Sequence, residues 1–348
     1  MRIDGISFIP ASRKMTNSDI LEEIRQLSEP GFKGDLQQAL NYIQWMLEEI
    51  GSRTRYWFSE GERPLEPMLK ACNEALEQAG CRPNDVDLLI YAGNCRGFME
   101  PADAYFIAHA LGMNNVHCFD ILDACMAWTR ACDVTQGFFQ SGRYRTALIV
   151  NAESFYLPGG VAYPSNFTLE STRDIAYCFS AYCGGDGTTA TLLRADPDRP
   201  WTFNYLSDKG TADLCTIPLA GHAGRAMPSE RIGLNGLGAF TSFSSQVFNH
   251  AHPFMVDVLR KLEPFRDSIR HVFAHTGGSV PIIQSWAEEA GFGDCVRFIY
   301  PEYGNLGAAS IPASIALHAQ DGSLSRGERF GFWMGSSGMS VASASLVY

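Results

Sequence analysis

Cys125 is the residue whose surroundings most favour covalent chemistry. The stretch FDILDACMAW completes an apolar strand at Ile121, adds the small residue Ala124, and opens a helix at the cysteine. We expect the positive end of the helix dipole and the free N–H groups there to stabilise a thiolate. The same N–H groups would hold the oxyanion that forms when a thiolate attacks a carbonyl. A buried structural cysteine is the alternative that this segment alone leaves open.

The other cysteines indicate neither a metal site nor a disulfide framework. The ten cysteines include no C-x-x-C pair, and ligands at the spacing of a zinc finger are missing. In a chain of 348 residues this pattern is typical of reduced, mostly buried thiols. We therefore predict no metal.

Alternating strands and helices have to position Cys125. Short apolar runs predict strands over 86–91, 116–121, 147–150, 188–193 and from 271 to 274. Amphipathic stretches predict helices over 66–78, 103–111, 126–140, 245–262, 280–290 and 308–318. This alternation predicts an α/β fold with largely buried strands. We interpret the irregular segment 204–242 as a connector, with one half over 1–200 and a second over 201–348.

Composition excludes several classes of protein. A length of 348 residues suggests two domains or one large duplicated fold. Hydrophobic residues at 46% and charged residues at 19% provide a core and exclude disorder. The net charge of -11, without any basic block, argues against nucleic acid as a partner. No apolar run approaches the ~20 residues of a membrane span, and the first residues do not resemble a secretion signal, so we expect a cytoplasmic protein.

Four stretches resemble, in order, motifs of the thiolase superfamily in its ketoacyl synthase III-like branch. FDILDACMAWTRA is similar to the nucleophile segment F-D-x-x-x-A-C-x-G-F, and CGGDGTTATLL to F-G-D-G-A-G-A-x-x-L. FAHTGGSVPII is similar to V-x-H-Q-A-N-x-x-I-I, and YGNLGAASIP to H-G-N-x-S-A-A-S-x-P. His275 and Asn305 have the separation found in that family. The resemblance extends over nearly the whole chain.

The resemblance implies a thiolase-like, five-layered αβαβα fold built from two similar halves, usually as a homodimer. It makes Cys125 the nucleophile that accepts an acyl group from a thioester. His275 and Asn305 would donate hydrogen bonds to an enolate oxygen, and a backbone N–H near Ser337 would serve as a further donor. Losing one such donor typically costs about 100- to 1,000-fold in rate. No cofactor is implied, because acyl-coenzyme A or acyl-carrier-protein thioesters are the substrates.

Departures from the family pattern bear on the substrate. Gly278 stands where many decarboxylating members have an asparagine, and Ala127 replaces a glycine. The run from Trp45 to Arg55 resembles W-x-x-x-R-x-G-I-x-x-R, which makes Trp45 and Arg53 candidates for binding the thioester. Trp45 matches a tryptophan that stacks on the adenine of coenzyme A. Because Glu49 replaces an arginine that contacts the nucleotide, an acyl carrier protein is an equal candidate for the donor.

Glu100 is the most informative departure. The common family members carry an apolar residue here that reaches across the dimer into the partner's acyl pocket. Glutamate followed by Pro101 resembles the non-decarboxylating subgroup, which comprises head-to-head acyl-condensing enzymes and pyrone-forming ketosynthases. Glu100 would then be the base that removes an α-proton, and an apolar tunnel would raise its pKa. A solvated loop carboxylate is the alternative, and we expect Arg96 to pair with it.

Three hypotheses follow for the function. The first is a Claisen condensation of two acyl thioesters through acyl-Cys125, in fatty-acyl or polyketide metabolism, with decarboxylative extension as a variant that leaves Glu100 without a task. The second is acyl transfer from Cys125 to an alcohol or amine with His275 as base. The third is a non-catalytic subunit of an active homologue, which the presence of Cys125, His275 and Asn305 disfavours.

Overall fold

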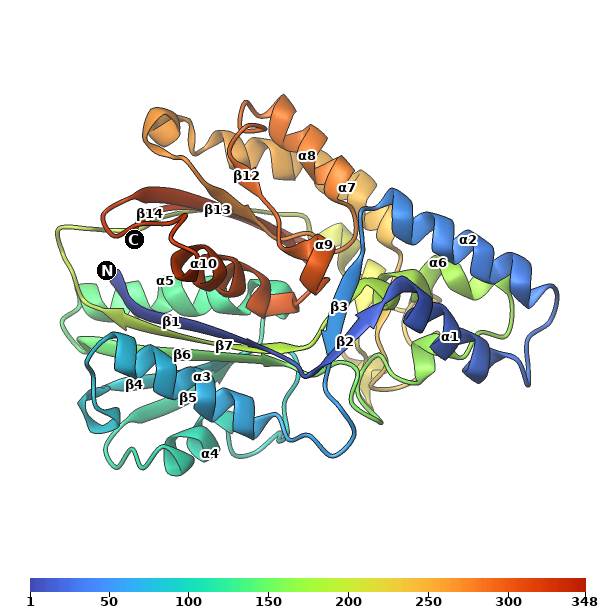
Figure 1. The fold of residues 1–348 in the computed structure, drawn as a ribbon, viewed down its shortest axis with the longest axis horizontal. Helices are drawn as coiled ribbons and strands as arrows, with labels where there is room; N and C mark the ends of the chain where they lie inside the picture. Colours follow the sequence, from blue (N-terminus) through green and yellow to red (C-terminus); the bar gives the residue numbers. More distant parts are fainter.

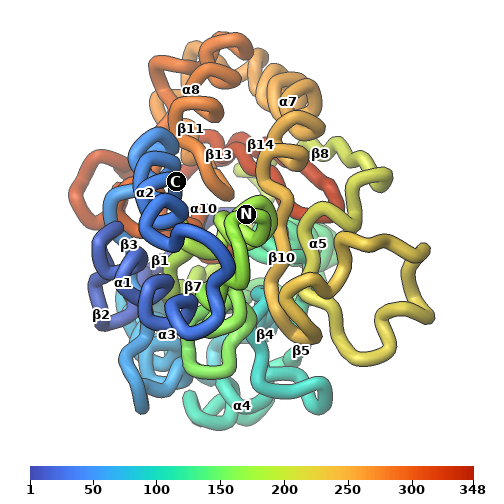
Figure 2. Tube along the Cα trace, turned by 90° about the vertical axis from the view of Figure 1, so that its right-hand side faces the viewer, coloured from blue at the N-terminus to red at the C-terminus, as the bar shows by residue number.

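Two five-stranded sheets and three layers of helices form the molecule. The computed structural model describes all residues 1–348. In Figure 1, helices α7 and α8 cover the upper sheet, α5 and α10 lie between the two sheets, and α3 and α4 cover the lower sheet. Figure 2 shows the stack after a quarter turn, with α7 and α8 at one end and α4 at the other. The predicted five-layered αβαβα architecture is confirmed.

The lower sheet has the strand order β1-β7-β6-β4-β5. Its strands are β1 (Arg2–Pro10), β4 (Leu88–Ala92), β5 (His117–Ile121), β6 (Thr146–Glu153) and β7 (Gly187–Arg194). Strand β4 pairs in parallel with β5 and β6, whereas β7 is antiparallel to β6 and β1. Every residue of β4 and β6 is buried, as expected for central strands that helices cover on both faces.

The upper sheet repeats this plan with the order β8-β14-β13-β11-β12. Its strands are β8 (Thr202–Ser207), β11 (Val272–Ala274), β12 (Val296–Arg297), β13 (Arg329–Ser336) and β14 (Ser340–Val347). The parallel and antiparallel pairings occupy the same places as in the lower sheet. The chain therefore contains two copies of one topology, in which β6 corresponds to β13 and α5 to α10.

The central helices have a composition unlike that of the outer helices. Helix α10 (Ser310–Gln320) begins with seven consecutive buried residues, most of them small, because sheets pack on both of its sides. Helix α5 (Ala127–Gln140) lies beside it. The outer helices are α3 (Leu65–Gln78), α4 (Asp103–Ala110), α7 (Ser244–Arg260) and α8 (Val280–Glu289). Each of these has a solvent-facing side, as expected for a surface helix.

A smaller unit covers one side of the stack, at the right of Figure 1. It contains α1 (Asn17–Ser28), α2 (Leu36–Glu49), the hairpin of β2 (Arg13–Thr16) with β3 (Thr54–Trp57), and α6 (Ile175–Cys178). Side chains from these elements share one apolar cluster. The remaining short elements are β9 (Cys215–Thr216), β10 (Thr241–Ser242) and α9 (Tyr300–Tyr303).

The predicted helices coincide with α3, α4, α5, α7, α8 and α10 to within about two residues at each end. The prediction of an irregular connector over 204–242 is wrong at its start, because Asn204–Ser207 belongs to β8. This edge strand is only half-buried and therefore lacks the continuous apolar run that marks a central strand. No helix has the combination of length and apolar composition that crossing a membrane requires.

Candidate active site

The duplicated topology brings two helix starts together. Cys125 lies between β5 and α5, and Asn305 lies between β12 and α10, which are corresponding places in the two halves. His275 directly follows β11 in the upper sheet. Ligand sites of open α/β sheets form at the carboxyl ends of the strands. The fold therefore gathers three residues that are far apart in the sequence.

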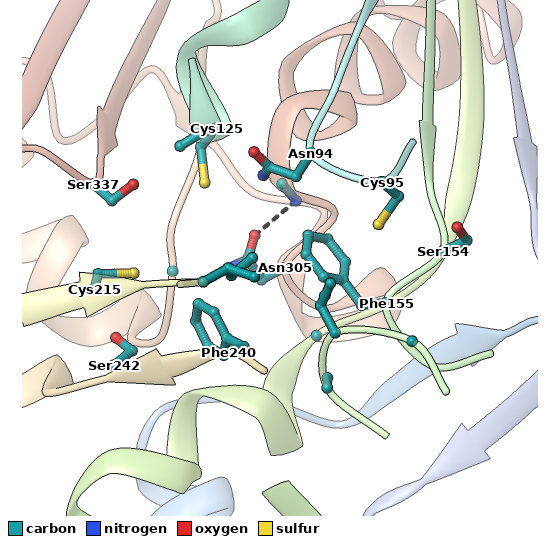
Figure 3. Close-up of a pocket in the computed structure, with 18 of the residues that line it drawn as sticks. Asn94, Cys95, Cys125, Ser154, Phe155, Cys215, Phe240, Ser242, Asn305 and Ser337 are labelled. Atoms are coloured by element: carbon teal, nitrogen blue, oxygen red, sulfur yellow. Dashed lines mark hydrogen bonds between the residues drawn. The ribbon is translucent and has the colours of Figure 1, made fainter. Parts of the chain in front are cut away.

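One cavity connects these residues. Cys125, His275, Asn305 and Ser337 all line a cavity of about 1090 Å³, and more than half of its lining residues are hydrophobic. This volume is at the upper end of the range of about 300–1,000 Å³ for small-molecule sites. Figure 3 shows the Cys125 sulfur pointing into the cavity, with Asn305 and Cys215 across from it. The site can hold an extended apolar group beside a nucleophile.

The backbone around Cys125 is fixed by the other half of the molecule. Cys125 lies in a 3-10 turn (Ala124–Met126) directly before α5. Ala124 has a φ of 46°, in the left-handed region that costs a non-glycine residue energy. The Met126 N–H donates to Ser336 Oγ at 3.3 Å, and Ser336 is the last residue of β13. Cys125 is therefore presented by a strained turn that a strand of the opposite half supports.

The resting state of Cys125 differs from the sequence-based expectation. Burial raises the pKa of the Cys125 thiol, and the neighbouring Cys215 and Glu153 raise it further. The predicted thiolate is therefore wrong for the unliganded site, because desolvation of the negative charge outweighs the helix dipole. A base has to take the thiol proton when the sulfur attacks.

His275 is a neutral imidazole. Only 4% of the residue is exposed, and its backbone N–H donates to the Trp333 carbonyl at 3.0 Å. Nδ1 has no hydrogen-bond partner in the protein. Burial lowers the pKa of His275 to about 4. At neutral pH the ring therefore has one donor and one acceptor nitrogen.

Asn305 is held on three sides. Its N–H donates to the Cys183 carbonyl at 2.9 Å, and its carbonyl accepts from the Gly185 N–H at 3.0 Å. Its Oδ1 accepts from the Gly307 N–H at 2.8 Å, drawn as the dashed line in Figure 3. The Nδ2 group is thereby left as the free donor, and it lies 3.7 Å from the Cβ position of Gly277, two residues after His275.

The Gly-Gly-Asp-Gly turn over residues 184–187 is needed for the contacts that hold Asn305. A Cβ at Gly185 would collide with the carbonyl oxygen of Tyr303. Asp186 is buried and accepts from the N–H groups of Phe155 at 2.7 Å and Phe58 at 3.3 Å. This motif therefore supports Asn305 by close backbone packing.

The structure leaves three of the predicted residues outside the cavity. Glu100 is exposed and does not line it, although the preceding Phe98 and Met99 do. The expected pairing of Arg96 with Glu100 is wrong, because β5 presents Asp120 to Arg96 at 3.4 Å.

Trp45 and Arg53 also lie on the surface. Trp45 is 54% exposed and its ring stacks on Tyr42 with the centroids 5.8 Å apart. Arg53 forms an ion pair with Glu302 at 2.7 Å. Their roles in binding stay predictions.

Sequence reasoning missed the polar groups that the lower sheet contributes. Asn94 and Cys95 lie in the loop after β4, the strand that corresponds to β11, and both line the cavity. Cys215 lines the cavity from β9. Glu153 is the buried carboxylate that closes β6, and its signal was a charge at the end of an otherwise uncharged strand.

Comparison with known proteins shows which enzymes the chain is similar to. Residues 260–348 match the family model described as 3-oxoacyl-[acyl-carrier-protein (ACP)] synthase III C terminal. The β-ketoacyl-[acyl-carrier-protein] synthase III of Aliarcobacter butzleri is 27% identical over 310 residues, which are 86% of this chain and 88% of that protein. The enzyme of the same name from Neisseria gonorrhoeae is 24% identical over 326 residues, 92% and 91% of the two chains.

Solved structures share the whole fold. OleA of Xanthomonas campestris, crystallised with lauric acid and lauroyl-CoA, superposes with a TM-score of 0.79 at 18% identity and covers 99% of this chain and 98% of its own. The 3-oxoacyl-[acyl-carrier-protein] synthase III of Aquifex aeolicus superposes with a TM-score of 0.76 at 20% identity and 99% coverage of both chains. The chain has the thiolase-type fold. Its sequence is similar to that of β-ketoacyl-[acyl-carrier-protein] synthase III enzymes over most of its length, as the motifs predict.

Proposed function

We propose that this protein joins two acyl thioesters by a Claisen condensation through an acyl-Cys125 intermediate. The observation that carries the proposal is the single, mainly hydrophobic cavity shared by Cys125, His275 and Asn305. The three side chains provide a nucleophile, a neutral imidazole and an amide donor. An acyl chain fits the apolar part of the wall, and the polar residues gather around the sulfur.

The first half-reaction transfers an acyl group to the protein. The Cys125 sulfur attacks the thioester carbonyl, the bond from that carbon to the donor's sulfur breaks, and the released thiolate takes up a proton. Because burial raises the pKa of the Cys125 thiol, attack requires a proton acceptor. The ring of His275 is neutral in the resting site and therefore has a nitrogen that can accept this proton. A backbone N–H near Ser337 would hold the tetrahedral oxyanion.

The second half-reaction forms the carbon–carbon bond. A base removes an α-proton from the second thioester, and the carbanion attacks the acyl carbon on Cys125, whose sulfur leaves. The enolate oxygen of the second thioester needs hydrogen-bond donors, and Asn305 Nδ2 and the donor nitrogen of His275 can supply two. Hydrogen bonding of Asn305 Oδ1 to Gly307 supports this assignment, because it fixes the amide orientation.

We propose that Glu100 removes the α-proton and that it does so in the active site of the other subunit of a homodimer. Glu100 lies outside the cavity of its own chain, while β5 is an edge strand whose neighbours expose a group of apolar side chains. That group comprises Phe98, Met99, Tyr105, Phe106 and Leu122. An exposed edge strand beside apolar side chains favours pairing with a second copy. Such pairing would bury Glu100 near the second copy's cavity.

The carrier of the thioester is expected to bind at the surface near α2. The Val280 N–H donates to the Ile50 carbonyl at 3.1 Å, so the end of α2 contacts the segment that follows His275. Trp45 lies one turn before that end; one face of its ring packs on Tyr42, and the residue, which is 54% exposed, is open to a flat group from solvent. Coenzyme A and an acyl carrier protein are both compatible with this surface.

Acyl transfer to an alcohol or amine is the second candidate. The position of Glu100 outside the cavity favours this reaction, because acyl transfer needs only one base and His275 lines the cavity. Products distinguish the two reactions: condensation gives a β-keto product or a pyrone, and transfer gives an ester or amide.

Product analysis with paired acyl thioesters tests the proposal. Wild type, Cys125→Ala and Glu100→Gln are compared, with Glu77→Gln as a control at an exposed carboxylate of α3. We expect Cys125→Ala to form no adduct, and Glu100→Gln to become acylated but to condense poorly. Normal condensation by Glu100→Gln would retire the base assignment. An ester or amide product would replace condensation with acyl transfer.

A further inference from the structure

A buried carboxylate supports the cavity wall from behind and has no task in the proposed reaction. Glu153 is the last residue of β6 and is 0% exposed. Its Oε1 accepts from the Ala308 N–H at 3.1 Å and from the Asn94 N–H at 3.5 Å, while Oε2 has no partner. Burying a carboxylate is costly unless hydrogen bonds compensate it. Its two bonds lead to loops on both sides of the cavity.

The first of these bonds leads to Asn305. Ala308 lies in the 3-10 turn Gly307–Ala309 that opens α10, and Gly307 donates to Asn305 Oδ1 at 2.8 Å. Consecutive N–H groups of one turn are thus held by the Asn305 side chain and by Glu153. A Cβ at Gly307 would lie 3.0 Å from Glu153 Oε1, so the carboxylate packs directly on this turn. A rotation of the turn would change the direction of the Asn305 amide.

The duplication supplies an independent argument. Ser336 ends β13 and accepts from the Met126 N–H at the start of α5, beside Cys125. Glu153 ends the corresponding strand β6 and accepts from the Ala308 N–H at the start of α10, beside Asn305. Each sheet therefore fixes the first turn of the other half's central helix. One of these turns carries the nucleophile, and the other carries the amide donor.

The second bond leads to the loop after β4. Asn94 and Cys95 begin the segment that continues to Phe98 and Glu100. Glu153 accepts a hydrogen bond from the Asn94 N–H, and Cys95 follows directly in the chain. Glu153 itself does not line the cavity, whereas Asn94 and Cys95 do. This position is unsuited to a base that touches substrate and suited to a group that holds two loops in register.

We propose that Glu153 is a positioning residue for carbon–carbon bond formation, because it fixes the turn of Asn305 and aligns that amide with the enolate oxygen. The inference rests on the proposed function for the step that it serves. Acylation of Cys125 depends on the other turn, which Ser336 supports. Glu153 should therefore affect the second half-reaction far more than the first.

Two variants of Glu153 separate its hydrogen-bonding role from its bulk. Glu153→Gln keeps an acceptor oxygen for the Ala308 N–H, and Glu153→Ala removes it. Asn151→Ala is the matched control, because Asn151 is a buried, hydrogen-bonded residue of the same strand that accepts from Thr189 Oγ1 at 3.1 Å. Each variant is made in the wild-type and Asn305→Ala backgrounds. Acylation is followed by mass spectrometry, and condensation by kcat and KM for the second thioester.

The expected result is a split between the two half-reactions. Glu153→Ala should acylate within about threefold of wild type but lose about 10- to 100-fold in the condensation kcat, with KM little changed. Glu153→Gln should keep most of the condensation kcat that Glu153→Ala loses. In the Asn305→Ala background, Glu153→Ala should cost less than about threefold, because both substitutions remove the same aligned donor. Asn151→Ala should lower stability while keeping kcat.

Losses that multiply in the double variant, or an equal fall of acylation and condensation, would overturn the inference. Amide hydrogen exchange provides a test that does not depend on catalysis. Amides of residues 304–309 should exchange faster in Glu153→Ala than in wild type, Glu153→Gln or Asn151→Ala, and unchanged exchange would also refute the role. If wild type condenses no thioester pair, the proposed function fails, while the exchange result still decides whether Glu153 holds the turn.

Discussion

Replacing Glu153 by glutamine should stabilise the protein increasingly as the pH rises. Burial raises the pKa of Glu153 from 4.5 to about 7, in spite of hydrogen bonds from Ala308 and Asn94 that favour the charged form. Between these two pKa values the native state keeps a proton that the unfolded chain has lost. The wild type therefore loses stability as the pH rises through this window, and the loss is complete above the folded-state pKa.

The size of this effect follows from the two pKa values. One unit of difference corresponds to about 1.4 kcal/mol, so the free energy of unfolding should change by roughly 2 to 3 kcal/mol between pH 5 and pH 8 through this group. The charged or titratable groups nearest to Glu153 include Cys95, Tyr91 and Asp186, whose pKa values it helps to raise.

Urea unfolding of wild type and Glu153→Gln at pH 5, 6, 7 and 8 measures the effect. The difference in unfolding free energy should move in favour of the glutamine variant as the pH rises, with most of the change between pH 5 and 7. Asn151→Ala serves as the control, and its difference from wild type should not vary with pH. A constant difference for Glu153→Gln would show that Glu153 titrates normally and would refute the burial argument.

Three further predictions concern the site and its assembly. Because burial lowers the pKa of His275 from 6.5 to about 4, the unfolded chain binds the extra proton in that window, so wild type should gain stability from pH 4 to 6.5 relative to His275→Gln; parallel melting curves of the two proteins would contradict this. Asn305→Ala should accumulate acyl-Cys125 in the mass spectrum while condensing about 100- to 1,000-fold more slowly, and a rate near wild type would remove it as a donor. Tyr105→Arg, at a residue 54% exposed beside the β5 edge, should give a monomer by light scattering that still folds, whereas Met227→Arg in an exposed loop should leave the dimer intact; a monomeric wild type would exclude the assembly.

The duplicated fold gives the catalytic residues different kinds of support. The lower and upper sheets each end in a side chain that fixes the opposite half's central helix, with Ser336 behind Cys125 and Glu153 behind Asn305. The serine is neutral, and the glutamate is a carboxylate with a pKa near 7. The side chain that supports the Cys125 turn is thus not titratable, while the one that supports the Asn305 turn can change its charge near neutrality.

The sequence by itself determined the elements and the motifs. Alternating apolar runs and amphipathic stretches predicted six helices within about two residues of their ends, because buried strands and surface helices have distinct periodicities. Cys125, His275 and Asn305 were predicted for a different reason, since each lies in a short motif that resembles one of the ketoacyl synthase III-like family. Edge strands such as β8 escaped because half-buried strands have a weak pattern.

Only the tertiary structure decided the charge states and the partners. The helix start predicted a thiolate at Cys125. The walls of the cavity, however, come from segments far along the chain; they exclude water from the sulfur and so raise the pKa of the thiol. The bond from Ala308 to Glu153 joins residues 155 positions apart, and Arg96 pairs with Asp120 on β5 instead of with nearby Glu100. Burial and pairing are properties of the packed chain as a whole, so local sequence could name the reacting groups but not their surroundings.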